Sequence, residues 1–190
     1  MEYHLQSPLS KDALAQLRIG DRVLLSGTLY TARDAAHQRM LALLEKGEPL
    51  PFSLQDACIY YAGPTPPRPG DVVGSIGPTT AGRMDNATPA LLRHGLAAMI
   101  GKGARNAEVL HTMQETGAVY FGFTGGAGAL AAACVTRCEL VAWEDLGSEA
   151  VRRLTVQGFP LVVLSDSVGG NLYAEGPAAY LQQVAKLQTP

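Results

Sequence analysis

The chain has 190 residues, of which 47% are hydrophobic and 17% charged, and this composition predicts a folded globular protein. Its 15 basic and 17 acidic residues are nearly balanced and form no basic block, so neither nucleic acid nor a lipid surface is an expected partner. No apolar segment approaches the ~20 residues that a membrane-spanning helix needs, and residues 1–5 lack the pattern of a signal peptide. We therefore expect one cytoplasmic domain over residues 1–190, with no membrane association.

Strand-like apolar runs alternate with helical patterns along the chain. Strands are expected at residues 21–31, 57–61, 71–73, 96–100, 118–123, 136–143 and 161–166. Helices are expected at residues 10–20, 32–47, 88–95, 106–115, 125–133 and 177–187, with a helical turn or two within 147–156. Residues 63–70 contain four prolines and predict a loop, because proline donates no backbone hydrogen bond. This alternation predicts an α/β fold with at least part of its sheet parallel.

Residues 74–85, GSIGPTTAGRMD, have the features of a turn that binds a small anion. The glycines and the proline let the backbone turn sharply and approach a ligand closely. Two adjacent hydroxyls, Thr79 and Thr80, precede Arg83, whose guanidinium can hold a carboxylate or phosphate through two parallel hydrogen bonds. On spacing alone, a glycine–proline turn with an exposed arginine explains the same residues.

Other polar side chains follow expected strands in the same way. Arg33 follows the strand expected at 21–31, and Lys102 follows the one expected at 96–100. Ligands of α/β proteins bind beyond the carboxyl ends of parallel strands. We therefore expect Arg33 and Lys102 to lie near Thr79 and Arg83, although a surface Gly-Lys-Gly turn is equally common.

Residues 33–37, RDAAH, carry three titratable side chains at the start of an expected helix. Arg33 and His37 are four residues apart and share one helix face. Asp34 can orient either of them, or it is simply a carboxylate favoured by the helix dipole. His37 fits a buried structural histidine as well as a proton-transfer group.

A second glycine-rich stretch fits the outline of a dinucleotide-binding fingerprint. Gly126, Gly128 and Ala131 have the spacing GxGxxA, and Glu144 and Asp145 follow about 20 residues later. In dinucleotide-binding domains this unit is normally the first βαβ, whereas here it comes late in the chain. Nucleotide binding is therefore the lesser alternative.

The chain has three cysteines, Cys58, Cys134 and Cys138, an odd and sparse set that argues against a disulfide scaffold. No C-x-x-C or Cys/His cluster surrounds them. Three cysteines can hold an iron–sulfur cluster with one open iron, but Cys58 lies in an apolar run and is typical of a small buried hydrophobe. We expect no metal site in this chain.

Together, several segments resemble the C-terminal domain of class I (iron–sulfur) fumarate hydratases and the β subunit of L(+)-tartrate dehydratase. In chain order they are residues 26–37, 77–85, 100–103, 125–127 and 159–161. The stretch 77–85, GPTTAGRMD, is the most specific, and the resemblance covers nearly the whole chain. It implies a swivelling β/β/α domain, a compact α/β sandwich with a mixed sheet and flanking helices.

The resemblance also implies an activity. The chain would be the β subunit of a two-chain hydro-lyase that hydrates fumarate to (S)-malate, with L(+)-tartrate or mesaconate as alternative substrates. The GRMD form of residues 82–85 favours fumarate. The [4Fe-4S] cluster would belong to an α subunit, in an α2β2 assembly. A stand-alone dicarboxylate-binding protein is the alternative from another class.

Roles for single residues follow from the same resemblance. Arg33, Arg83 and Lys102 match substrate-binding positions, and Thr80 lies beside them in the sequence. Thr79 matches the proposed proton-transfer position. Because an unperturbed hydroxyl is a poor base, Thr79 would need cationic neighbours or a relay through other groups. Asp34 and His37 are the expected relay groups.

Overall fold

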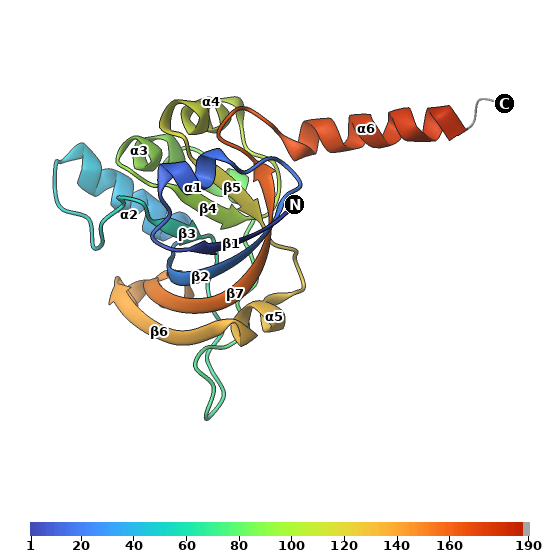
Figure 1. Ribbon diagram of the computed structural model, residues 1–190. Coiled ribbons are helices and arrows are strands. Elements are labelled where there is room, and N and C mark those ends of the chain that lie inside the picture. Colours follow the sequence, from blue (N-terminus) through green and yellow to red (C-terminus); the bar gives the residue numbers. More distant parts are fainter. Residues whose placement is uncertain (188–190) are drawn as a thin grey trace.

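The structure, a computed structural model, describes residues 1–187 and contains seven strands in that range (Figure 1). The strands are β1 (Glu2–Gln6), β2 (Arg22–Thr31), β3 (Cys58–Tyr60), β4 (Ala98–Gly101), β5 (Val119–Gly122), β6 (Val135–Ala142) and β7 (Val151–Ser165). The α-helices are α1 (Lys11–Ala15), α2 (Asp34–Glu45), α3 (Thr88–Arg93), α4 (Ala107–Thr116), α5 (Gly128–Ala133) and α6 (Leu172–Leu187). Two short 3₁₀ helices are η1 (Ala81–Met84) and η2 (Glu144–Glu149).

Strands β2, β3, β4 and β5 are parallel neighbours, and β7 closes them into a five-strand barrel. It does so by pairing antiparallel with both β2 and β5. β1 adds to β2 in parallel, and β6 adds to β7 in antiparallel. The prediction of a mixed α/β sheet with flanking helices is confirmed, but the sheet closes on itself, which the expected sandwich did not include. The swivelling arrangement and the single domain over residues 1–190 stay predictions.

β7 reaches both edges because it has 15 residues, a length of about 50 Å at the rise of an extended strand. The expected helical turns within 147–156 are wrong beyond Ala150. Residues 151–156 pair with β2 on one side and β6 on the other. Their buried positions, Val151, Leu154 and Val156, are interspersed with more exposed ones, as in a strand with one face on the core.

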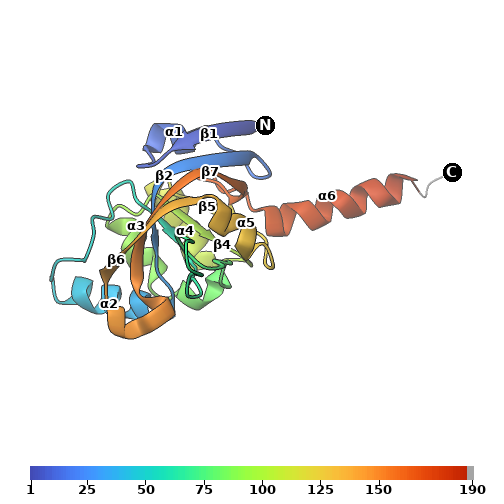
Figure 2. The ribbon, with the colours of Figure 1, turned by 90° about the horizontal axis from the view of Figure 1, so that it is seen from below.

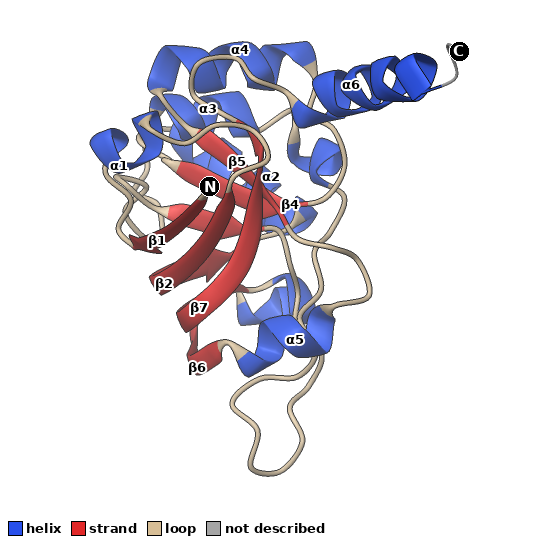
Figure 3. Ribbon diagram, turned by 45° about the vertical axis from the view of Figure 1, so that its right-hand side comes forward, coloured by secondary structure: helices blue, strands red, loops and turns tan. Residues whose placement is uncertain are grey.

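The strand expected at 71–73 is also wrong, because these residues belong to a loop that extends away from the barrel (Figure 3). The loop is closed at its base by the Thr65 N–H, which donates to the Ser75 carbonyl at 3.0 Å. Prolines at 64, 66, 67 and 69 supply no N–H groups, so this segment offers residues 71–73 no regular ladder partner. Val73 is nevertheless buried, and Val72 is half exposed.

Two apolar cores lie on the two faces of the parallel strands. Cys58 and Tyr60 of β3 belong to the core inside the barrel, whereas Ile59 belongs to the core under the helices. Helices α2, α3 and α4 cover that second face (Figure 1), with Met40 and Met113 among their buried side chains. Strands buried on both faces have continuous apolar sequences, which is why β3, β4 and β5 were recognisable.

Helix α6 projects from the body of the molecule (Figures 1 and 2). It begins at Leu172, five residues before its expected start, because Asn171 and Glu175 cap it reciprocally. The Asn171 Oδ1 accepts from the Tyr173 N–H at 3.1 Å, and the Glu175 Oε1 accepts from the Asn171 N–H at 2.9 Å. Among residues 1–187, no helix combines the length and the apolar character needed to cross a membrane.

Candidate functional site

Thr79 and Lys102 are held side by side at the carboxyl ends of β3 and β4. The Thr79 N–H donates to the Tyr61 carbonyl at 2.6 Å, and the Lys102 N–H donates to the Thr79 carbonyl at 3.3 Å. The Ala81 N–H then donates to the Lys102 carbonyl at 2.8 Å. Thr79 was expected to follow a strand. Instead, it is inserted between the ends of two strands. The prediction that Thr79 and Lys102 lie close together is confirmed.

Arg33, Asp34 and Arg83 form a second group on the adjacent elements. The Asp34 carboxylate lies between the two guanidinium groups, with its Oδ1 2.7 Å from the Arg83 Nε and its Oδ2 3.9 Å from the Arg33 Nε. Arg33 and Asp34 follow β2, which neighbours β3 in the barrel. The Ala32 N–H bonds to the Tyr60 carbonyl, so Arg33 starts next to the strand end that holds Thr79.

Glu149, which the sequence did not suggest, completes this group. Its Oε1 lies 3.4 Å from the Arg33 Nη2, and its Oε2 accepts from the Ala35 N–H at 2.9 Å. Arg33, at the N-cap of α2, provides no side-chain cap of its own. Glu149 thus caps α2 from a segment 114 residues away and holds Arg33 at the same time. No local pattern around Glu149 signals this role.

The three cationic side chains face solvent to different degrees. The Arg83 side chain is 51% exposed, and the Arg33 side chain is 22% exposed. Thr80 and Lys102 are exposed, and Thr79 is half-buried. Three cations against the two carboxylates Asp34 and Glu149 leave a net positive charge, which suits an anionic ligand.

Two buried polar atoms of this group have no hydrogen-bond partner among the described residues, the Arg33 Nε and the Asp34 Oδ2. Buried polar atoms are nearly always paired in folded proteins, so an unpaired donor and an unpaired acceptor in one place need an explanation. A bound ligand or ordered water would satisfy them.

Glycines leave room for the Lys102 side chain and shape its backbone. A Cβ atom at position 125 would lie 3.2 Å from the Lys102 Nζ. Gly103 has a φ of +86°, a backbone conformation that residues other than glycine rarely adopt. Tyrosines hold its peptide groups on both sides: the Gly103 N–H donates to the Tyr173 Oη at 2.8 Å, and the Tyr120 hydroxyl donates to the Gly103 carbonyl at 3.0 Å.

His37 is buried beneath the site. Its Nδ1 lies 2.9 Å from the Arg33 carbonyl, and its ring packs edge-on against Tyr61 at a centroid distance of 5.2 Å. Burial lowers the pKa of His37 to about 4, a shift that the Arg33 carbonyl only partly opposes. The ring is therefore neutral near pH 7, with the proton on Nδ1 and an acceptor at Nε2 that has no hydrogen-bond partner within residues 1–187. Its predicted proton-transfer role stays a prediction.

The cysteines do not fit an iron–sulfur cluster. Cys58 is fully buried in β3, where burial raises the pKa of its thiol strongly, while Cys134 and Cys138 lie at the end of α5 and on β6. Within residues 1–187, no three His, Cys, Asp or Glu side chains are grouped so that they could hold a metal ion.

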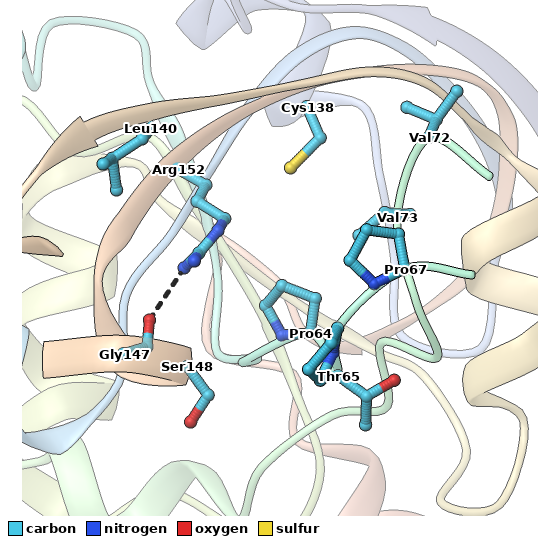
Figure 4. Close-up of a pocket in the computed structure, with 11 residues that line it drawn as sticks. Pro64, Thr65, Pro67, Val72, Val73, Cys138, Leu140, Gly147, Ser148 and Arg152 are labelled. Carbon is cyan, nitrogen blue, oxygen red and sulfur yellow. Dashed lines mark hydrogen bonds between the residues drawn. The ribbon is translucent and has the colours of Figure 1, made fainter. Parts of the chain in front are cut away.

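A cavity of about 550 Å³ lies between the 63–75 loop and strands β6 and β7 (Figure 4). Its lining is mostly apolar, with Pro64, Val73 and Leu140 among the lining residues, and the Arg152 guanidinium there donates to the Gly147 carbonyl at 3.0 Å. None of the residues predicted for the site lines this cavity. We therefore place the candidate site at the strand ends and not here.

The dinucleotide fingerprint lacks its structural context. Helix α5 has only six residues, and the strand after it, β6, pairs with β7 in antiparallel. A βαβ unit needs a parallel return strand beside the first one. Gly128 instead packs against the site stretch, where a Cβ atom would lie 3.0 Å from the Gly77 nitrogen.

Comparison with known proteins indicates the family of the chain. Residues 1–176 match the family model described as fumarase C-terminus. The chain is 40% identical over 181 residues to a protein of Methanocaldococcus jannaschii, provisionally named L(+)-tartrate dehydratase subunit beta, with 92% of each chain covered. It is 34% identical over 188 residues to the L(+)-tartrate dehydratase subunit beta of Escherichia coli, covering 96% of this chain and 92% of that one. The anaerobic class I fumarate hydratase of Escherichia coli is 38% identical over 170 residues, covering 87% of this chain but 31% of that enzyme.

Proposed function

The chain belongs to the fumarase C-terminus family, and from this premise we propose that it is the β subunit of a two-chain iron–sulfur hydro-lyase that acts on a C4 dicarboxylate. The observation that supports this most is that Arg33 and Arg83 share the Asp34 carboxylate, next to the strand ends where Thr79 and Lys102 are joined through their backbones. A dicarboxylate carries two negative charges, and these cations match them. The relatives of similar length are named as β subunits, whereas the chain spans only about a third of the fumarate hydratases it matches. An α subunit would supply the remainder, in an α2β2 assembly.

Arg83 and Arg33 are the proposed carboxylate clamps. The Arg83 Nε is bonded to Asp34, which leaves both terminal Nη groups of this half-exposed side chain for a substrate carboxylate. Asp34 and Glu149 fix the direction of Arg33 in the same way. A guanidinium held by one carboxylate binds a second with less loss of side-chain entropy.

Thr79 is the proposed proton carrier, with Thr80 and Lys102 next to the substrate. The Thr79 backbone is bonded on both sides, to Tyr61 and Lys102, which fixes the backbone that carries the hydroxyl. Because a hydroxyl is a weak base, nearby cations or a relay are needed for it to exchange a proton with a substrate carbon. Asp34 and His37 are the proposed relay groups.

We assign the [4Fe-4S] cluster to the α subunit, since the cysteines of this chain do not fit one. We propose fumarate, hydrated reversibly to (S)-malate, as the substrate, because residues 82–85 read GRMD. L(+)-tartrate is the second candidate, favoured by the names of the relatives that align over their whole length.

The test is anaerobic co-expression of the chain with a cluster-bearing α subunit, followed by assays with fumarate, L(+)-tartrate and mesaconate. Turnover of one of these is expected only in the complex. Turnover of none by a cluster-loaded complex would refute the proposal, and tight malate binding by the chain alone would favour the stand-alone binding protein.

A substitution separates binding from proton transfer within that complex. Thr79→Ala is expected to abolish turnover while malate still binds, as measured by calorimetry. Thr136→Ala, which removes an exposed hydroxyl on β6, is the matched control and should leave turnover unchanged. Normal turnover by Thr79→Ala would exclude Thr79 as the proton carrier.

A further inference from the structure

Asp85, the last residue of the GRMD sequence, does not face the candidate site. Its side chain is 8% exposed, and its Oδ1 lies 2.7 Å from the Nε of Arg105, whose side chain is fully buried. The other oxygen, Oδ2, accepts from the Asn106 N–H at 2.8 Å. The most specific motif of the sequence therefore ends in a buried ion pair.

The Arg105 guanidinium also contacts other buried side chains, among them Thr88, Tyr61 and Tyr120. Its Nη2 donates to the Thr88 Oγ1 at 2.8 Å, and its Nη1 donates to the Tyr61 Oη at 3.2 Å. It lies over the rings of Tyr61 and Tyr120, at 5.2 Å from each centroid. Arg105 is thus bonded in several directions at once.

Each of these three residues makes a further hydrogen bond, either to a site residue or to the residue directly after one. Tyr61 provides the carbonyl that accepts from the Thr79 N–H at 2.6 Å. The Thr88 hydroxyl donates at 2.8 Å to the carbonyl of Met84, the residue after Arg83. The Tyr120 hydroxyl donates at 3.0 Å to the carbonyl of Gly103, the residue after Lys102.

A well-packed apolar side chain in place of a buried ion pair often gives equal or greater stability, so stability alone does not explain a buried arginine with these contacts. We propose that Arg105 is a positioning residue, whose buried guanidinium fixes the backbone that presents Thr79, Arg83 and Lys102. The proposal rests on the proposed function only for what those three residues do to a substrate.

The first test needs no activity. Hydrogen exchange is measured by NMR or mass spectrometry on the full chain and on Arg105→Lys, which keeps the charge but loses the guanidinium fork. The amides of Thr79 and Gly103 are expected to exchange at least ten times faster in Arg105→Lys, with the β2–β7 ladder unchanged. Arg93→Lys, on the exposed side of α3, is the control and should change neither. Unchanged exchange, or equal acceleration in every strand, would overturn the proposal.

The second test uses the complex with the α subunit and compares kcat with KM. Arg105→Lys is expected to lower kcat/KM at least tenfold, with a higher KM and a lower kcat. A merely structural arginine would lower the folded fraction, and so kcat per mass of protein, with KM unchanged, and that result would overturn the proposal. If the wild-type complex is inactive, the proposed function fails, while the exchange experiment still decides the role of Arg105.

A milder variant keeps both tests decisive if Arg105→Lys does not fold. Thr88→Val preserves the side-chain shape and the Arg105–Asp85 pair but removes the hydroxyl that links Arg105 to the Met84 carbonyl. The Asp85 amide donates to the Gly82 carbonyl at the end of η1. In Thr88→Val its exchange should be accelerated, relative to wild type, more than the exchange of the Thr79 amide. If both amides exchange at their wild-type rates in Thr88→Val, this network has no positioning role.

Discussion

The burial of His37 predicts a specific loss of stability in mild acid. An unfolded histidine has a pKa of about 6.5, whereas burial lowers the pKa of His37 in the folded chain to about 4. Between these two pKa values, the histidine binds a proton in the unfolded chain but not in the folded chain. The free energy of unfolding is therefore highest above the unfolded pKa and falls as the pH drops below it. Since one pKa unit corresponds to about 1.4 kcal/mol, His37 alone should cost about 2 kcal/mol of unfolding free energy between pH 7.5 and 5.0.

The assay is urea unfolding of wild type and His37→Gln at both pH values. The glutamine does not titrate, so the difference between the two pH values should be about 2 kcal/mol smaller in the variant than in wild type. His94 provides a matched control, because its Nδ1 also lies near the carbonyl four residues earlier, 2.7 Å from the Ala90 oxygen, but its side chain is exposed. His94→Gln should keep the pH dependence of wild type.

The lower limit of pH 5.0 keeps the titration of Asp21 out of the comparison. The α-amino group of Met1 and the Arg18 N–H lower the pKa of Asp21, so the stability that Asp21 contributes is lost only as the pH falls below the usual range of aspartate. That loss is common to wild type and both variants. Equal pH dependence in His37→Gln and wild type would refute the reasoning that the folded chain holds His37 buried and neutral.

Two other substitutions test single contacts of the site. Glu149→Ala removes the cap of α2 and the partner of Arg33. It should lower the free energy of urea unfolding by about 1 kcal/mol and raise the KM for the dicarboxylate in the complex. An unchanged KM would show that Glu149 has no part in substrate binding. Gly125→Ala places a Cβ atom 3.2 Å from the Lys102 Nζ, so calorimetry on the complex should show weaker malate binding while the melting temperature stays nearly unchanged. Gly126, with a φ of +84° but no atom near its Cβ position, is the contrasting position, where alanine should lower stability and leave affinity unchanged.

Features that depend on local sequence were predictable. Ser10 caps α1 by accepting from the Ala13 N–H, as its position before the helix indicates. Lys102 directly follows β4, and its place near Thr79 follows from the rule that ligands bind at the carboxyl ends of parallel strands. The early start of α6 carried a signal too, since Asn171 and Glu175 have the character of a capping pair.

Features that depend on contacts between distant parts of the chain were not predictable. Thr79 lies next to Lys102, as expected, but the residues before it form a loop and not the expected strand. Glu149 has no motif and reaches Arg33 only because β7 pairs with β2. Arg105 stands in a polar loop after Lys102, where an arginine is usually exposed, and only the fold buries it between Tyr61 and its other partners.

The closing strand therefore does more than complete the core. The residue pairs Thr31–Arg152 and Tyr30–Arg153 place the start of β7 beside the end of β2, and this brings η2, which immediately precedes β7, against the start of α2. The Thr31 hydroxyl further connects the end of β2 with the start of β7, since it lies 3.4 Å from the Ala150 carbonyl and accepts from the Arg152 N–H at 3.1 Å. Thr79 and Lys102 depend only on the parallel strands β3 and β4, but Arg33 depends on both the parallel strands and the antiparallel closure. One half of the candidate site is thus built by local strand ends, and the other half also needs the global topology, which is why the sequence indicated Arg33 but not Glu149, the carboxylate that holds it.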